Sequence, residues 1–231
     1  MEREDLFTDG RGIRIRLAES RRVHRARDGR LLLTVRAVRP MVEVRGNAAA
    51  GRAVTAYARS FSLPGMDSRT VARLAEADYA ARGRENWRGY TLDTQFAPAR
   101  ADEAVISFLV TEFLDMGGAH PDTRAAGLNF SSHSGKRLRL DDVVLDKRAA
   151  VRQIHAFLLK EAKRKEAAGE AAFFEGYEKS IGELLTEDTW YLERDGMHVI
   201  GNEYMVSPHA AGILDFVIPY GQADFLKEEY R

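Results

Sequence analysis

The stretch VISFLVTEFLDMGGAHP, residues 105–121, decides how the fold is interpreted. Its first six residues are apolar on both faces of an extended chain, which is typical of a β-strand covered on both sides. Gly117 and Gly118 then allow a sharp turn, because glycine tolerates positive φ. Pro121 favours an extended conformation at His120. The stretch therefore predicts a buried strand that ends in a tight turn carrying an imidazole and closed by Pro121.

Other runs of strand-forming residues lie on both sides of this stretch. An Asp28-Gly29 turn between two such runs predicts a hairpin, and Pro40 is expected to limit further central pairing of its second strand. A second hairpin is expected across the Ser134-Gly135 turn, between residues 128–130 and 138–140. Further strands are expected at residues 90–96, 190–192, 197–200 and 213–218.

Helical periodicity occurs between the groups of strands. It predicts a helix capped by Asn47, a helix from Asp67 or Ser68 to near Gly83, two helices at 151–162 and 173–185, and a short terminal helix within 222–230. Strands and helices thus occur in blocks, without strict alternation. This order favours an α+β fold with a mostly antiparallel sheet and helices packed largely on one side.

The composition narrows the class of protein. The 231 residues are 45% hydrophobic and 30% charged, and 35 basic residues balance 35 acidic ones, so nucleic acid or an anionic membrane is not expected as the main partner. The first 45 residues contain an excess of arginine, including Arg11, which could form a basic face. The alternation over residues 14–17 favours instead a strand with Arg14 and Arg16 on its solvent side. The lack of cysteine excludes disulfides and thiolate zinc sites. No run of about 20 apolar residues predicts a membrane span.

Several short motifs appear together in one order: Gly117-Gly118-Ala119-His120, Asn129-Phe130, Gly135-Lys136, Leu138-Arg139-Leu140-Asp141-Asp142, Glu203-Tyr204, Pro208-His209-Ala210-Ala211-Gly212 and Ile218-Pro219-Tyr220. This set resembles a domain of unknown function found in the anti-sigma factor RsiV and ahead of the catalytic domain in PdaC-type peptidoglycan deacetylases. Residues 31–99 are similar to the segment that usually precedes that domain. We therefore expect a PdaC-like segment at 1–100 and an RsiV-like segment at 101–231, which together form one compact unit.

The resemblance implies a bacterial, extracytoplasmic protein, periplasmic or at the cell surface, that recognises an envelope or extracellular partner. A peptidoglycan fragment is one implied ligand, and lysozyme, the partner of RsiV, is another. The chain contains neither a sigma-factor-binding segment nor a deacetylase domain, so the activities of those relatives are not implied. Residues 1–12 lack the apolar core of a signal peptide, so we expect any export signal to lie outside this sequence.

Two loops hold the candidate binding residues, which are His120, Glu203, Tyr204 and His209. If the loops fold together, an imidazole pair, a carboxylate and a phenol line a common groove and bind a ligand. Alternatively, His120 bridges backbone groups across its turn, and the second loop is an ordinary polar loop. No cofactor and no metal site are expected, and no catalytic constellation is convincing. The enzymatic alternative is a cell-wall glycan hydrolase or deacetylase-like enzyme that uses His120 and Glu203 for acid-base work.

The remaining polar and aromatic candidates have simpler structural interpretations. The histidines lack the spacing of a metal motif, and His155 lies on an apolar helical stripe. Residues 131–134 are expected to form a turn and not a serine nucleophile, and Asp141-Asp142 to precede a helix more readily than to bind calcium. The larger aromatics could stack on sugars but more often end strands in a core: Trp87, Tyr90, Trp190 and Tyr191. A structural domain without a small ligand remains a third hypothesis.

Overall fold

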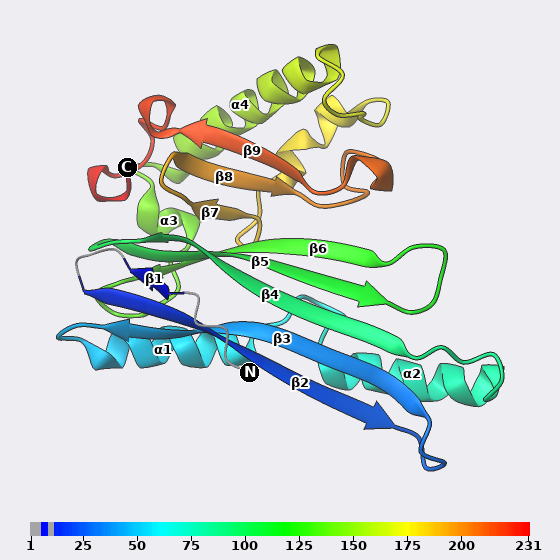
Figure 1. Ribbon diagram of the computed structural model, residues 1–231. Coiled ribbons are helices and arrows are strands. Elements are labelled where there is room, and N and C mark those ends of the chain that lie inside the picture. Colours follow the sequence, from blue (N-terminus) through cyan, green and yellow to red (C-terminus); the bar gives the residue numbers. More distant parts are fainter. Residues whose placement is uncertain (1–5, 9–11) are drawn as a thin grey trace.

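A computed structural model describes residues 6–8 and 12–231, which form two β-sheets and four α-helices (Figure 1). Met1 and Arg11 lie outside the described residues. The larger sheet has six strands in chain order: β1 (Leu6–Thr8), β2 (Ile13–Arg25), β3 (Leu31–Val44), β4 (Tyr90–Ala101), β5 (Val105–Asp115) and β6 (Asp122–Ser131). The smaller sheet contains β7 (Trp190–Leu192), β8 (Gly196–Gly201) and β9 (Leu214–Pro219).

Neighbouring strands are antiparallel except β3 and β4, which are parallel. The exception arises because two helices lie between β3 and β4 in the chain, α1 (Ala48–Ser60) and α2 (Ser68–Arg82), and a parallel pair needs such a crossover. Asn47 and Asp67 cap these helices through their side chains, as the sequence predicts. The α+β class with a mostly antiparallel sheet is therefore confirmed.

The β2–β3 hairpin is longer than expected. β3 continues through Pro40, which lies opposite Leu17, and ends at Val44. On its other side β3 pairs with β4 only as far as Val38, so the expectation that Pro40 limits further central pairing is confirmed. At Pro40 the strand has a partner on one side only, so the missing N–H removes no hydrogen bond to a central neighbour.

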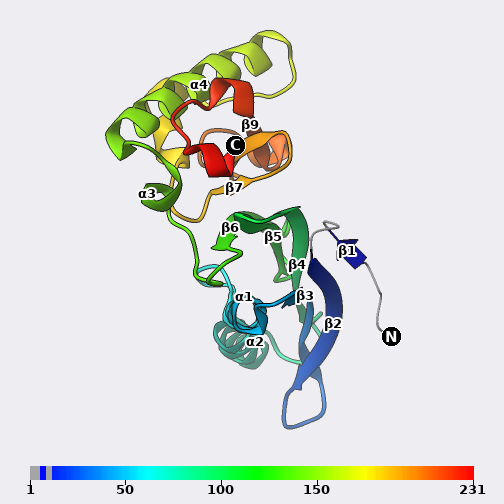
Figure 2. The same cartoon turned by 90° about the vertical axis from the view of Figure 1, so that its left-hand side faces the viewer.

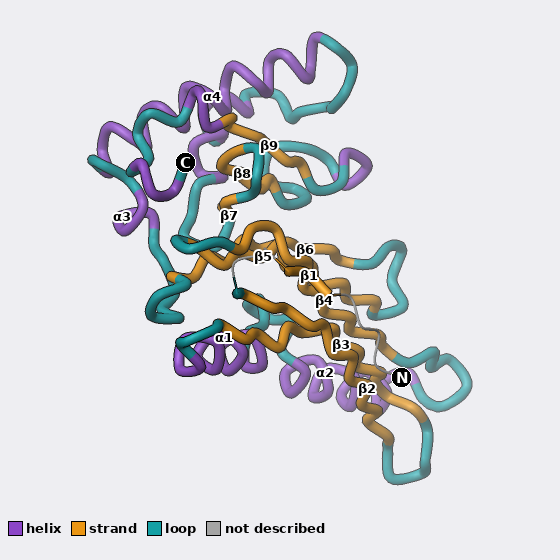
Figure 3. Tube along the Cα trace, turned by 60° about the vertical axis from the view of Figure 1, so that its left-hand side comes forward, coloured by secondary structure: helices purple, strands orange, loops and turns teal. Residues whose placement is uncertain are grey.

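The two sheets pack face to face, with helices on the outer faces (Figures 1 and 2). α1 and α2 cover one face of the six-stranded sheet, and the three-stranded sheet lies against the other. Outside the smaller sheet runs α4 (Lys147–Ala167), joined to β6 through the short α3 (Leu140–Val143). β5 is therefore covered on both faces, as its apolar sequence predicts, and both Ser107 and Phe108 are fully buried. Figure 3 shows the same stacking from the side.

The junction between the sheets depends on three residues of β5 and β6. The Asn129 side chain donates to Trp190 O at 3.1 Å and accepts from the Leu192 N–H at 2.9 Å, so it binds the backbone of β7 like a neighbouring strand. Ser107 Oγ donates to Leu192 O. At Gly127 a Cβ atom would lie 2.1 Å from Trp190 O, so only glycine permits this approach.

Two predicted elements differ in the structure. The predicted helix at 173–185 is wrong: two short 3₁₀ helices replace it, Tyr177–Lys179 and Ile181–Leu184. Gly176 adopts a left-handed φ of 77°, and Gly182 packs against the His155 ring, so the chain follows the surface of α4 in short turns. These short turns also place apolar residues at helical spacing on one side, so the apolar pattern alone does not distinguish them from an α-helix.

The expected strand at 138–140 is also wrong. Beyond β6 the chain forms a single bridge, between Phe130 and Arg137, and Leu140 already begins α3. Near the C-terminus, the residues 222–230 form no α-helix but contain a 3₁₀ turn at Glu228–Tyr230. In both places short turn-like structure takes the place of a regular element. The apolar side chains still face a core, and Leu138, Leu140 and Tyr230 belong to the cluster under α4.

Among the described residues, no helix is both long and apolar enough to cross a membrane. The expected division of the chain at residues 100 and 101 falls at the end of β4, whose neighbours in the sheet come from both sides of that boundary. The two-segment division stays a prediction.

Candidate functional site

The β5–β6 and β8–β9 loops meet at one end of the two sheets and bring the four predicted binding residues together. Tyr204 Oη lies 3.1 Å from His120 Nε2, and His209 Nδ1 lies 2.7 Å from Glu203 Oε2. The rings of His120 and His209 stack with centroids 4.2 Å apart. We call these four residues the loop cluster.

The first of these loops is shaped by Gly117, which adopts a φ of 69°. Its N–H donates to Asp115 Oδ1 at 2.8 Å, so the end of β5 holds the turn. Gly118 has no positive φ, and a Cβ added there would meet only His120 O at 4.0 Å, so one glycine, not two, carries the conformational requirement. His120 Nδ1 lies 3.1 Å from Pro121 O, which leaves Nε2 directed toward Tyr204.

The second loop is anchored to β6 by Asn202. The Asn202 side chain accepts from the Ala125 N–H at 2.7 Å and donates to Ala125 O at 3.0 Å. Tyr204 follows with a φ of 64°, the one positive φ among the described non-glycine residues. Its N–H donates to Ser207 O at 3.1 Å. A tight, anchored turn therefore holds the Tyr204 ring away from the core.

Burial separates the members of the loop cluster into a surface layer and a deeper one. Tyr204 is 55% exposed, whereas the Glu203 side chain is 9% exposed and is partnered by His209. Two exposed apolar side chains add to this surface: Met205 belongs to the loop, and Phe174 lies beside it, because the Phe174 N–H donates to Val206 O at 3.0 Å. The cluster thus presents aromatic and apolar surface, with a carboxylate–imidazole pair beneath it.

The other candidates take the structural roles that the sequence allowed. The large aromatics are buried in the core: Trp87, Tyr90, Trp190 and Tyr191. Asp142 accepts from the Arg139 N–H at 2.7 Å and caps α3, and Asp141 pairs with Lys147. Ser131 Oγ accepts from the Ser134 N–H at 3.3 Å in the expected turn.

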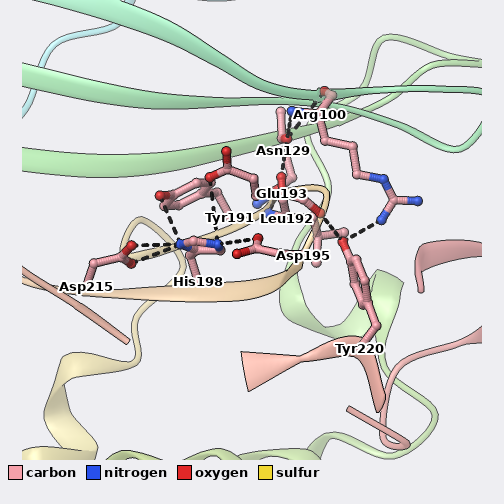
Figure 4. A network of polar contacts seen from close by, with 10 residues as sticks. Arg100, Asn129, Tyr191, Leu192, Glu193, Asp195, His198, Asp215 and Tyr220 are labelled. Carbon is pink, nitrogen blue, oxygen red and sulfur yellow. Dashed lines mark hydrogen bonds and ion pairs between the residues drawn. The ribbon is translucent and has the colours of Figure 1, made fainter. Parts of the chain in front are cut away.

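A second polar group, which the sequence analysis does not single out, surrounds His198 on β8 (Figure 4). The ring is buried and lies 4.8 Å from the Tyr191 ring. Its Nδ1 is 2.8 Å from Asp215, and its Nε2 is 2.9 Å from Asp195 and 3.7 Å from Glu193. Burial disfavours the charged ring, but the hydrogen bonds and charges of Asp215 and Asp195 outweigh it and raise the pKa of His198 to about 9.

Glu193, Asp195 and His198 are the one group of three in the described part of the chain whose ligand atoms could hold a metal ion. No metal site is expected from the sequence, because the histidines lack the spacing of a metal motif. In the structure, His198 Nε2 already pairs with Asp195, so the arrangement is that of an ion-paired imidazolium. The sequence did contain one signal for this group: His198 lies inside a predicted strand, three residues after Asp195 of the Asp195-Gly196 turn.

Tyr220 and Arg100 connect this group to the larger sheet (Figure 4). Tyr220 Oη donates to Glu193 O at 2.5 Å and accepts from Arg100 Nη1 at 2.6 Å. Arg100 also donates to Tyr230 O at 2.8 Å. The buried guanidinium therefore ties β4 to the turn that precedes β8 and to the C-terminal residues.

Comparison with known proteins places this fold. Residues 141–221 match the model of the family DUF3298, described as a protein of unknown function. The chain is similar to the crystal structure of a DUF3298 family member from Bacteroides fragilis, with TM-score 0.61 and 16% identity over 99% of this chain and 96% of that one. It is also similar to a DUF3298 family protein from Pseudomonas aeruginosa, with TM-score 0.57 and 14% identity over 94% and 95%.

No curated protein matches the chain. The resemblance to RsiV and PdaC-type proteins therefore stays a prediction, and the likeness to the two crystal structures shows the fold alone. Residues 141–221 match the DUF3298 family model, and nearly the whole chain has the fold of two DUF3298 proteins.

Proposed function

We propose that this protein is an extracytoplasmic recognition module of the bacterial cell envelope that binds a glycan, such as a peptidoglycan fragment, at the loop cluster. The observation that carries the proposal is the exposed Tyr204 ring, held on a left-handed backbone next to two imidazoles.

The backbone of Tyr204 supports a functional role. A residue other than glycine in the left-handed region costs roughly 1–2 kcal/mol, and such outliers gather at functional sites when the surrounding structure maintains them. Here the Asn202 anchor and the Ser207 carbonyl maintain the turn. Burial of the Tyr204 ring does not offset this free-energy cost, since the ring remains 55% exposed. A binding role for the ring explains why this strained turn carries a tyrosine.

The chemistry of the cluster suits a sugar. The apolar face of a sugar ring packs on aromatic faces, and imidazole, phenol and carboxylate groups exchange hydrogen bonds with hydroxyls. Tyr204 and the stacked pair of His120 and His209 offer such faces, with Met205 beside them. The envelope location is supported by the resemblance to the RsiV and PdaC-type proteins and is part of the proposal.

The enzymatic alternative needs His120 and Glu203 to act on a common point. In the structure Glu203 pairs with His209, while His120 Nε2 pairs with Tyr204. Acid-base catalysis needs both groups within hydrogen-bond reach of the reacting atoms. This pairing favours binding over catalysis.

Isothermal titration calorimetry with purified muropeptides, and separately with lysozyme, tests the proposal. We expect muropeptide binding that weakens at least tenfold in Tyr204→Ala and His120→Ala. His133→Ala is the matched control, because His133 is an exposed histidine beyond the opposite end of β6.

Each contrary outcome is distinct. Binding of lysozyme without binding of muropeptides would replace the glycan with a protein partner. Cleaved or deacetylated muropeptides, detected by mass spectrometry, would establish the enzymatic alternative. If neither ligand binds, the loop cluster is not a recognition site for them. Fractionation of the native bacterium tests the location separately, and a cytoplasmic protein would contradict the envelope assignment.

A further inference from the structure

The six-stranded sheet carries a row of small and polar side chains on the face that α1 and α2 cover. Ser20, Ala37, Thr94 and Glu112 lie opposite one another in register on β2, β3, β4 and β5. Large apolar residues normally fill a sheet face beneath helices. This row therefore leaves space where a packed core is expected.

A cavity of about 190 Å³ lies over the row. Its other walls come from the end of α1, the start of α2 and the segment between them, residues 59–62 and 66–68. The two helices follow one another along this face (Figures 1 and 3). A dry cavity of about 150 Å³ accepts benzene, so this one has room for a slightly larger molecule.

Glu112 forms the inner end of the cavity and is fully buried. Its carboxylate accepts from the Leu63 N–H at 2.7 Å and from Thr94 Oγ1 at 3.1 Å. No described cation forms an ion pair with it, because Arg39 donates instead to the carbonyls of Ala58 and Phe61. Burial raises the pKa of Glu112, while those hydrogen bonds and the charge of Arg39 oppose the rise. A buried carboxylate that lacks a paired cation is suited to receive an ammonium group.

Apart from Asp67, whose carboxylate caps α2 by accepting from the Thr70 N–H, the charged side chains toward the outer end of the cavity are basic. Arg22 and Arg59 are exposed and line it, and neither guanidinium forms a hydrogen bond or ion pair with a described residue. Arg39, half-buried between them and Glu112, adds a third guanidinium. Guanidinium groups bind carboxylates well, because their planar fork of donors matches the two oxygens.

We propose that this cavity binds a small zwitterion, a free α-amino acid, with its ammonium group at Glu112 and its carboxylate at Arg22, Arg39 and Arg59. A simple anion would meet the Glu112 carboxylate, and a simple cation would meet three guanidiniums. Only a ligand with both charges is complementary to both ends. The cavity volume limits the ligand to a small side chain. This site is separate from the loop cluster and independent of its function.

Titration of ¹⁵N-labelled full chain with L-alanine and D-alanine, followed by NMR, tests the proposal, with acetate and methylammonium as single-charge controls. We expect one or both alanines to shift amide resonances of residues that line the cavity, such as Thr94 and Met66. Each single-charge compound should bind at least tenfold more weakly than alanine. This comparison needs no variant and so does not depend on how a variant folds.

Three variants assign the two ends. Glu112→Gln should weaken alanine binding at least tenfold and strengthen acetate binding, because it removes the carboxylate that opposes an anion. Arg22→Ala and Arg59→Ala should weaken both compounds. Arg52→Ala, an exposed arginine of α1 outside the cavity, should change neither.

Several results would overturn the proposal. Alanine that leaves the spectrum unchanged at millimolar concentration would show that the cavity holds solvent only. Acetate binding as tight as alanine binding would show an anion site. Unchanged alanine affinity in Glu112→Gln would show that this carboxylate does not bind the ligand. If that variant does not fold, the arginine variants decide: alanine affinity equal to that of the wild type in both Arg22→Ala and Arg59→Ala would overturn the proposal.

Discussion

Tyr204 Oη lies 3.1 Å from His120 Nε2, and this contact joins residues 84 positions apart in the chain. His120 follows a strand of the larger sheet, whereas Tyr204 follows a strand of the smaller sheet. The contact can form only when the two sheets dock in this orientation. The loop cluster therefore depends on the sheet junction at Gly127 and Asn129, which lies some distance along β6.

The left-handed backbone at Tyr204 predicts an unusual order of stabilities. Tyr204→Gly and Tyr204→Ala both remove an exposed ring and its hydrogen bond to His120, but only glycine relieves the backbone strain. We expect the glycine variant to unfold with a free energy about 1 kcal/mol higher than that of the alanine variant. Urea denaturation of the two variants measures the difference. Muropeptide binding should be lost in both.

An alanine variant as stable as the glycine variant would show that the turn is not strained. The wild type and Gly118→Ala form the control for the general effect of glycine, because Gly118 has no positive φ. At this position the alanine variant should be the more stable of the two, because alanine restricts the unfolded chain.

The sequence predicted much of this fold because local patterns report local structure. The caps at Asn47 and Asp67 and the doubly buried β5 follow from residue type and spacing alone. The hypothesis that the Gly117 turn meets the 203–209 loop required a long-range contact, and the structure contains it. The binding role of these loops stays a prediction.

What the sequence could not predict depends on tertiary packing. Alternation shows that a strand has a buried face, but not which sheet the strand joins, so the separate sheet of β7, β8 and β9 went unforeseen. His198 lies inside an apolar strand, and its acidic neighbours Asp195 and Asp215 come from different parts of the chain. Only the fold brings Asp215 to that ring.

The close contact at Gly127 predicts a severe effect of a single methyl group. In Gly127→Ala the Cβ would meet the backbone of β7 at 2.1 Å, so one sheet must shift relative to the other. We expect a loss of about 3 kcal/mol in the free energy of unfolding. Gly118→Ala, where the Cβ would make only an ordinary contact with His120 O at 4.0 Å, should change the free energy of unfolding by less than about 1 kcal/mol. Equal stabilities in urea would show that the sheets do not approach this closely.

Asn129 predicts a destabilisation that depends on pH. Asn129→Asp removes the donor to Trp190 O and buries a carboxylate next to that carbonyl, since Asn129 is 1% exposed. We expect a loss of about 3 kcal/mol at pH 7. The loss should shrink at low pH, because burial raises the pKa of the new carboxyl and its protonated form can donate again.

Urea denaturation at pH 7 and at about pH 4, near the usual Asp pKa, measures this dependence. Asn202→Asp is the matched control, because Asn202 bonds the backbone of Ala125 in the same two-way manner but is only partly buried. Its loss should be smaller. A destabilisation of Asn129→Asp that does not change with pH would contradict the buried carboxyl.

The ion pairs of His198 predict that stability falls in alkaline solution. Asp215 and Asp195 outweigh the burial of the ring and raise its pKa from 6.5 to about 9, so the folded protein binds the proton more tightly than the unfolded chain does. The resulting stabilisation is complete below about pH 6.5 and disappears as the pH rises through 9. The shift corresponds to roughly 3 kcal/mol. We expect a measured loss of about 1–2 kcal/mol, because half-exposed carboxylates are screened by solvent.

Urea denaturation at pH 6 and at about pH 9.5, beyond the folded pKa, measures this loss, and NMR titration of the His198 ring measures the pKa itself. His198→Gln keeps a polar side chain but cannot titrate, so its stability should change much less over the same range. Asp215→Asn removes one partner and should lower the pKa of His198, which moves the loss of stability toward neutral pH. A wild-type ring that titrates near 6.5 would mean that the two carboxylates do not hold a charged imidazole.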